Sequence, residues 1–127
     1  MRRALLKVIA AERVGPYTLL RLGRGPLLPG NPGQFFMLSP PGRLLPRPMS
    51  LSIARTHEFG FLIDPIGPGT RALANASRGE RIAVLGPLGN GFCLNVERPL
   101  LVGGGIGIAP LAIWGDALGD LKIAGLR

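Results

Sequence analysis

Cysteine and histidine are almost absent from this chain of 127 residues, which contains one of each. With Cys93 alone, an internal disulfide is excluded, and so is a metal or iron–sulfur site built only from cysteines of one chain. The single histidine, His57, lies in the polar stretch ARTHEFG (54–60). We interpret it as a solvated loop residue, and we assign no catalytic side chain and no metal ligand.

Long apolar runs are missing as well. No stretch is long enough to span a membrane. The charged residues Lys7, Glu12 and Arg13 interrupt the first apolar run, where a signal peptide would need a longer unbroken one. We therefore expect a cytoplasmic protein with no membrane partner. A chain of this length corresponds to one domain, or to one domain with a fragment of another.

Acidic and aromatic residues are also few. The chain has 7 Asp and Glu against 15 Lys and Arg, which gives a net charge of +8, and only 6% of its residues are aromatic. A basic protein can bind nucleic acid, anionic membranes or small molecules that carry phosphate. Here the arginines are scattered singly, without the interleaved aromatics of a single-strand binder. We therefore predict no nucleic-acid partner. The alternative hypothesis is a non-enzymatic basic barrel that binds oligonucleotides.

Glycine and proline are abundant, with 20 and 13 residues. This composition favours short elements between turns over a helical bundle. Apolar residues alternate within several extended runs, so that Phe61 and Ile63 share one face, as do Ile82 and Val84. Strands at such close spacing predict a barrel or a sandwich. The six runs cover residues 4–14, 17–23, 34–39, 48–54, 60–67 and 81–86.

One short helix is predicted between the last two of these strands, within GPGTRALANASRGE (67–80). Thr70 is the expected N-cap, and the Ala-Leu-Ala stretch at 72–74 favours helix. Gly79 is expected just past the C-terminus of the helix, where glycine is common.

The composition changes after residue 98. LLVGGG (100–105) predicts a short buried strand, Pro110 suits a first helical turn, and LKIAGL (121–126) predicts another strand. We expect a barrel domain over residues 1–98 and the first strand–helix–strand of an α/β nucleotide-binding domain over 99–127. Five residues would pack against further strands of that domain, and exposed they would form an apolar patch: Leu100, Leu101, Val102, Leu111 and Trp114.

Three motifs are candidate phosphate or cofactor sites. RPMS (47–50) offers a permanently charged guanidinium fork where a loop enters a strand. GPGTRAL (67–73) joins glycines, which allow close backbone approach, to a helix start. The glycines of LLVGGGIGIAPL (100–111) can expose backbone N–H groups, but their spacing departs from G-x-G-x-x-G. The structural alternatives are a surface arginine, a capped helix and a tight strand-to-helix turn.

The order of five motifs is more specific than any one of them. GQFFML, RPMSLSIA, GPGTRAL, LGPLGNGF and LLVGGGIGIAPL follow one another with consistent gaps. In this set the chain resembles the ferredoxin reductase-type flavoproteins, and within them the electron-transfer subunits of NAD-linked dihydroorotate dehydrogenase. The resemblance runs from about residue 4 to about residue 114. It implies a mainly β fold, with a six-stranded antiparallel FAD-binding barrel followed by a nicotinamide-nucleotide domain.

The resemblance also implies site residues. In the Arg-Pro-x-Ser motif the wider superfamily often has a flavin-stacking tyrosine where this chain has Met49. The strand that lines the flavin through its backbone often has Tyr-Arg where this chain has Ile63 and Asp64. The implied cofactor-binding residues are Arg47, Pro48, Met49, Ser50, Leu62, Ile63, Asp64, Gly69 and Thr70, with Gly69 and Thr70 at the FAD pyrophosphate. The implied partial nucleotide site comprises Gly103, Gly104, Gly105 and Gly107.

The function implied by the resemblance is electron transfer in pyrimidine biosynthesis. In complete relatives, electrons pass from NADH through FAD and a [2Fe–2S] cluster to a catalytic dihydroorotate dehydrogenase subunit. Their nucleotide domain is longer and carries the four cluster cysteines, so we expect here an incomplete NAD site, no cluster and no activity of this chain alone. We interpret the chain as truncated, with a natural stand-alone barrel as the alternative. A ferredoxin–NADP reductase or flavin reductase relative with another electron partner is a further alternative.

Overall fold

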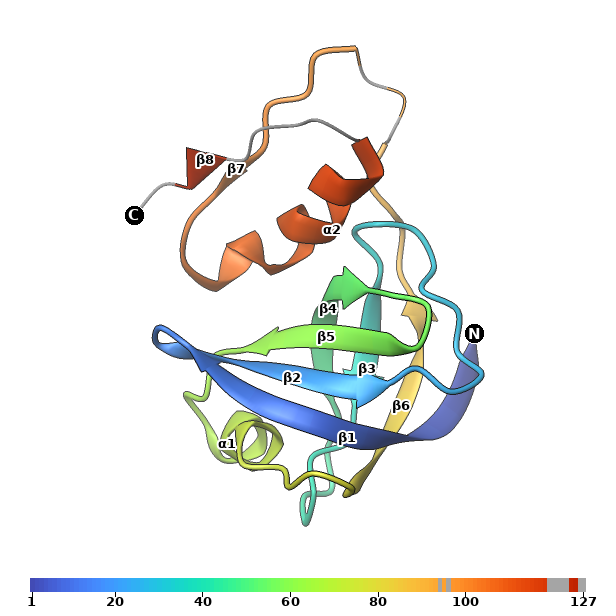
Figure 1. Cartoon of the computed structure of the whole chain (residues 1–127), viewed down its shortest axis with the longest axis vertical. Coiled ribbons are helices and arrows are strands. Elements are labelled where there is room, and N and C mark those ends of the chain that lie inside the picture. The colour runs from blue at the N-terminus through green and yellow to red at the C-terminus, as the bar shows by residue number, and fades with distance from the viewer. Residues whose placement is uncertain (94, 96, 119–123, 126–127) are drawn as a thin grey trace.

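Six antiparallel strands close into a barrel in the order β1-β2-β5-β4-β3-β6, which confirms the predicted fold class (Figure 1). The computed structural model describes residues 1–93, 95, 97–118 and 124–125, with side chains up to residue 113. Closure leaves the barrel without edge strands. The strands are β1 (Arg2–Val14), β2 (Tyr17–Gly23), β3 (Phe35–Leu38), β4 (Arg47–Ala54), β5 (Glu58–Ile63) and β6 (Arg81–Leu88).

The barrel interior is filled by alternate side chains of its strands, as the pleat requires. Three phenylalanine rings form its centre, with centroid separations of 5.3 Å between Phe36 and Phe59, 5.9 Å between Phe36 and Phe61, and 6.3 Å between Phe59 and Phe61. All three rings are fully buried. The inward faces predicted from the alternation are confirmed, because Ile63, Ile82 and Val84 are buried with Phe61.

Helix α1 (Pro68–Ala74) connects β5 to β6 and starts earlier than the sequence suggested. Gly67 is the N-cap and Pro68 the first helical residue, so the prediction that Thr70 is the N-cap is wrong. Proline suits the first helical position because its missing N–H would have no partner there. Gly79 is not at the helix end either. It lies in a separate turn after the Asn75 C-cap, with φ +87°, and its N–H donates to the Val8 carbonyl at 2.9 Å.

The region after the barrel is a strand–helix–strand unit, as predicted. It contains β7 (Val102–Gly103), the 3₁₀ turn η1 (Gly105–Ile108), α2 (Ala109–Leu118) and β8 (Ala124–Gly125), and β7 pairs with β8 in parallel. Strand β7 is shorter than the strand predicted over 100–105, and of the run 121–126 only 124–125 lie within the described residues. Helix α2 packs against β4 at one end of the barrel (Figure 1). Within the described part of the chain, no helix is long and apolar enough to cross a bilayer.

The expected apolar patch on this unit is only partly present. Leu100 and Val102 are exposed as predicted, but Leu101 and Leu111 are buried. Gly103 explains the burial of Leu111, since a Cβ placed on this glycine would lie 2.6 Å from Leu111 Cδ1. Leu111 of α2 therefore packs directly against the backbone of β7, which helps to bury its side chain. The side chain of Trp114 lies outside the described residues.

Candidate functional site

Two of the predicted motifs meet in space, although they are far apart in sequence. Arg47 opens β4, and its guanidinium lies over Gly69 in the first turn of α1. A Cβ placed on Gly69 would be 2.6 Å from Arg47 Nε and 3.0 Å from both Cζ and Nη2. No side chain fits there without moving the guanidinium. Glycine therefore lets the cation lie directly against the helix backbone.

Arg47 is unpaired within the described part of the chain, where its side chain makes no ion pair with a carboxylate and no hydrogen bond. The ion pairs of these residues lie elsewhere, on the outside of β1, β2 and β5. There Arg21 bonds Glu58 at 2.8 Å and Glu12 at 2.9 Å. The hydrogen bond from Arg21 holds the pKa of the Glu58 carboxyl below its ordinary value. Arg21 is thus neutralised by its neighbours, whereas the charge of Arg47 is available to an anion.

Thr70 has a different role from the one its sequence context suggested. Its Oγ1 accepts a hydrogen bond from the Gly67 N–H at 3.0 Å and donates one to the Gly67 carbonyl at 3.1 Å. This is a capping interaction from the third helical position, which satisfies backbone groups at the helix start. The single hydroxyl proton of Thr70 is therefore already in use.

The residues that follow Arg47 in β4 divide between the two faces of the strand. Met49 is partly buried and packs against the barrel core, while Pro48 is exposed and Ser50 is half-buried. Strand pairing places Met49 opposite the buried Phe36 and Ser50 opposite Phe35. Where Arg-Pro-x-Ser proteins often have a stacking tyrosine, this chain thus has a methionine that contributes to the core.

The second predicted segment lies where β5 ends. The side chain of Ile63 is fully buried in the barrel core, so only its backbone can face a ligand. Leu62 and Asp64 are half-buried, and Asp64 follows the last residue of the strand. The Asp64 carbonyl accepts a hydrogen bond from the Ile66 N–H at 2.8 Å, which shapes the turn into α1.

The four glycines of the last motif occupy the turn from β7 into η1. Gly103 permits the close packing of Leu111, Gly104 caps η1, and Gly105 has φ +59°. The oxygen of Tyr17, from the β1–β2 hairpin, lies 3.6 Å from where a Cβ of Gly105 would be, whereas Gly107 has open space around it. The tight-turn interpretation thus accounts for Gly103 and Gly105.

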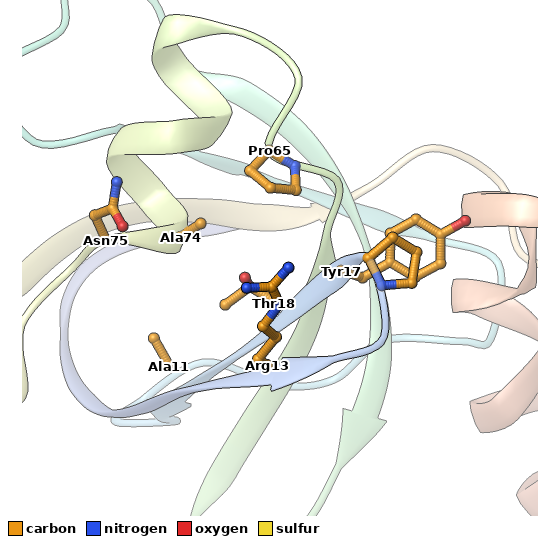
Figure 2. A pocket seen from close by; sticks show the side chains of 8 residues that line it. Ala11, Arg13, Tyr17, Thr18, Pro65, Ala74 and Asn75 are labelled. Carbon is orange, nitrogen blue, oxygen red and sulfur yellow. The ribbon is translucent and has the colours of Figure 1, made fainter.

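Two open hollows flank α1 and the start of β4. One, of about 360 Å³, is lined by the β1–β2 hairpin and the C-terminal end of α1, with Arg13, Thr18 and Asn75 around it (Figure 2). None of the predicted site residues lines it. The other, of about 430 Å³, is lined by Arg47 and by the loop before β4, including Leu44 and Leu45. Sequence reasoning missed this loop, although two adjacent leucines among prolines, a glycine and arginines were a signal.

Comparison with known proteins agrees with the predicted resemblance, although no family model matches the chain. The chain is 40% identical over 83 residues to the dihydroorotate dehydrogenase B (NAD(+)) electron transfer subunit of Clostridium perfringens, covering 64% of this chain and 34% of the relative. It is 35% identical over 129 residues to the subunit of the same name from Listeria monocytogenes, covering 94% of this chain and 51% of the relative.

Solved structures of two reductases contain the same barrel. The fold matches the cytochrome P450 reductase GcoB of Amycolatopsis with a TM-score of 0.74 and 25% identity, over 87% of this chain and 37% of that one. It matches the ferredoxin reductase in carbazole 1,9a-dioxygenase with a TM-score of 0.78 and 20% identity, over 98% of this chain and 42% of that one.

The structural matches show that the chain contains a barrel of the ferredoxin reductase type. Among proteins with this barrel, its sequence is related to the electron transfer subunits of dihydroorotate dehydrogenase B. The chain spans between about a third and a half of the length of these curated relatives.

Proposed function

We propose that this chain is the flavin-binding part of an electron-transfer subunit, and that it binds FAD where β4 and α1 begin. The observation that carries the proposal is the unpaired guanidinium of Arg47 over the Gly69 backbone. A planar cation with five donors binds phosphate oxygens through two parallel hydrogen bonds. The sequence relatives named electron transfer subunits and the flavoprotein-type barrel both support this assignment.

The residues present fit an FAD site. Arg47 would hold the phosphates, and Gly69 would let them approach the α1 backbone, because no side chain fills that space. Ser50 and the backbone of Ile63 would face the flavin ring system, whereas Met49, which packs against the core, would support the site from that side. When bound, FAD supplies the acceptance of a hydride and the release of single electrons, and the protein supplies its binding and orientation.

The proposal also names the electron donor and the electron acceptor. Following the relatives, NADH would be the donor and a catalytic dihydroorotate dehydrogenase subunit the acceptor. We assign the barrel to residues 1–98 and the start of the nucleotide-binding unit, with its glycines Gly103, Gly104, Gly105 and Gly107, to residues 99–127. The [2Fe–2S] cluster does not fit this chain, whose single cysteine cannot supply four ligands.

The oligonucleotide-binding alternative is weakened by where the aromatic rings lie. Phe36, Phe59 and Phe61 are in the barrel core, where they cannot stack on bases.

The experiment that tests the proposal is an absorption spectrum of the purified chain, repeated after FAD is added and unbound FAD is removed by desalting. A retained flavin band is the expected result. A colourless protein after this reconstitution would contradict the proposed site. The oligonucleotide-binding alternative is tested on the same preparation by fluorescence anisotropy of a labelled single-stranded oligonucleotide. Binding at low salt that weakens steeply as salt is added would support that alternative.

A further inference from the structure

We propose that the loop from Pro40 to Pro46, called here the leucine loop, holds the adenosine half of the dinucleotide and makes the site selective for FAD over FMN. This inference rests on the proposed FAD site, because it concerns the continuation of that site beyond the phosphates. It assigns a role to Leu44 and Leu45, which none of the sequence motifs includes.

The leucine loop has a defined backbone. The Arg43 N–H donates to the Pro40 carbonyl at 3.1 Å, and Gly42 has φ +70°. With proline in the second position and a positive φ in the third, this is the arrangement of a type II turn. Pro46 restricts the chain again just before β4 begins. Because prolines reduce the freedom of the unbound loop, less conformational entropy is lost when a ligand orders it.

The two leucines are largely exposed to solvent. The exposed fraction is 99% for Leu44 and 67% for Leu45. With Gly42, Arg43 and Arg47 they line the open pocket of about 430 Å³. Two apolar side chains between two guanidinium groups suit a ligand with a flat apolar part and a negative charge. An adenine joined to a pyrophosphate has both properties.

Arg47 makes the pocket continuous with the phosphate position. The same side chain that covers Gly69 also lines the pocket of the leucine loop. A dinucleotide whose phosphates bind Arg47 therefore has its adenosine end within reach of Leu44, Leu45 and Arg43. Leucine side chains cover an aromatic base by apolar contact, and an arginine stacks on its face. FMN lacks the adenosine and would leave this pocket empty.

The test is the double variant Leu44→Ser/Leu45→Ser, with Leu28→Ser as the matched control. Leu28 is also an exposed loop leucine, with an exposed fraction of 66%, and it does not line the pocket. Dissociation constants for FAD, FMN and NADH are measured by titration of the flavin-free protein, and thermal unfolding confirms that both variants remain folded. We expect the double variant to bind FAD about tenfold more weakly, equivalent to about 1.4 kcal/mol. We expect the affinity for FMN to stay within twofold and Leu28→Ser to match the wild type.

Three other results would overturn the inference, in different ways. An unchanged FAD affinity would show that the leucine loop does not contact the cofactor, while the proposed function would stand. An equal loss for FAD and FMN would assign the loop to the flavin end of the site. A loss confined to NADH would mean that the pocket takes the adenosine of the nicotinamide nucleotide instead. If the wild type binds neither flavin, the proposed function itself fails, and this inference with it.

Discussion

Replacing Arg47 by alanine tests the centre of the proposed site most directly. The change removes the cation that lies over Gly69 but breaks no ion pair of the described residues. Hydrogen bonds that involve a charged group contribute roughly 1.5–3 kcal/mol. A loss of this size raises the dissociation constant of FAD roughly 10- to 150-fold. The barrel should stay folded, because its core does not include this side chain.

The assay is a titration of flavin-free protein with FAD, followed by the change in flavin fluorescence or by calorimetry. Arg78→Ala is the matched control, since Arg78 is an exposed arginine in the turn after α1 that neither covers Gly69 nor lines the pocket beside Arg47. Its FAD affinity should equal that of the wild type. An Arg47→Ala protein that is folded and binds FAD with the wild-type dissociation constant would refute the reasoning.

Gly69→Ala separates the position of the guanidinium from its charge. The new Cβ would lie 2.6 Å from Arg47 Nε, so the long and flexible arginine side chain has to move. We expect weaker FAD binding with little change in the free energy of unfolding. Wild-type FAD affinity in this variant would show that the contact between Arg47 and Gly69 does not define the site.

Three further predictions concern the stability of the fold. The hydrogen bond from Arg21 holds the pKa of Glu58 below its ordinary value of 4.5. The stability that this interaction contributes is therefore present above pH 4.5 and is lost as the pH falls through the lowered pKa. Glu58→Gln should accordingly destabilise the protein at neutral pH but not below the lowered pKa. A constant difference in urea unfolding across this range would contradict it. Phe59→Ala should cost about 3–5 kcal/mol in the same assay, because it empties the fully buried centre of the barrel, and a cost under 1 kcal/mol would show that the core refills. Thr70→Val should lower the free energy of unfolding by about 1 kcal/mol while Thr70→Ser retains stability, because only the hydroxyl bonds Gly67; equal stability of the two variants would exclude the capping role.

Three predicted features differ in the folded chain. Thr70 has the chemistry of an N-cap, and only the position of Pro68 in the folded chain shows that the helix starts before it. Gly79 fits a helix end by spacing, yet it serves a separate turn that bonds to β1. Leu101 and Leu111 were expected to be exposed, but contacts within the strand–helix unit bury Leu111. Gly79 depends on a residue distant in the chain, which local propensity does not include, whereas the starting point of α1 and the burial of Leu111 depend on residues nearby in sequence.

The sequence by itself determined the strands, their inward faces and the order of the motifs. Alternation of apolar residues reports which side of a strand is buried, and glycine and proline mark where strands stop, so both are local signals. Only the tertiary structure decided which motifs form one site. It closes the barrel so that the start of β4 lies beside α1, which places Arg47 over Gly69 and leaves Leu44 and Leu45 next to that cation. The physical reason is that a binding site is defined by distances across the fold, and pairing between strands far apart in sequence sets those distances.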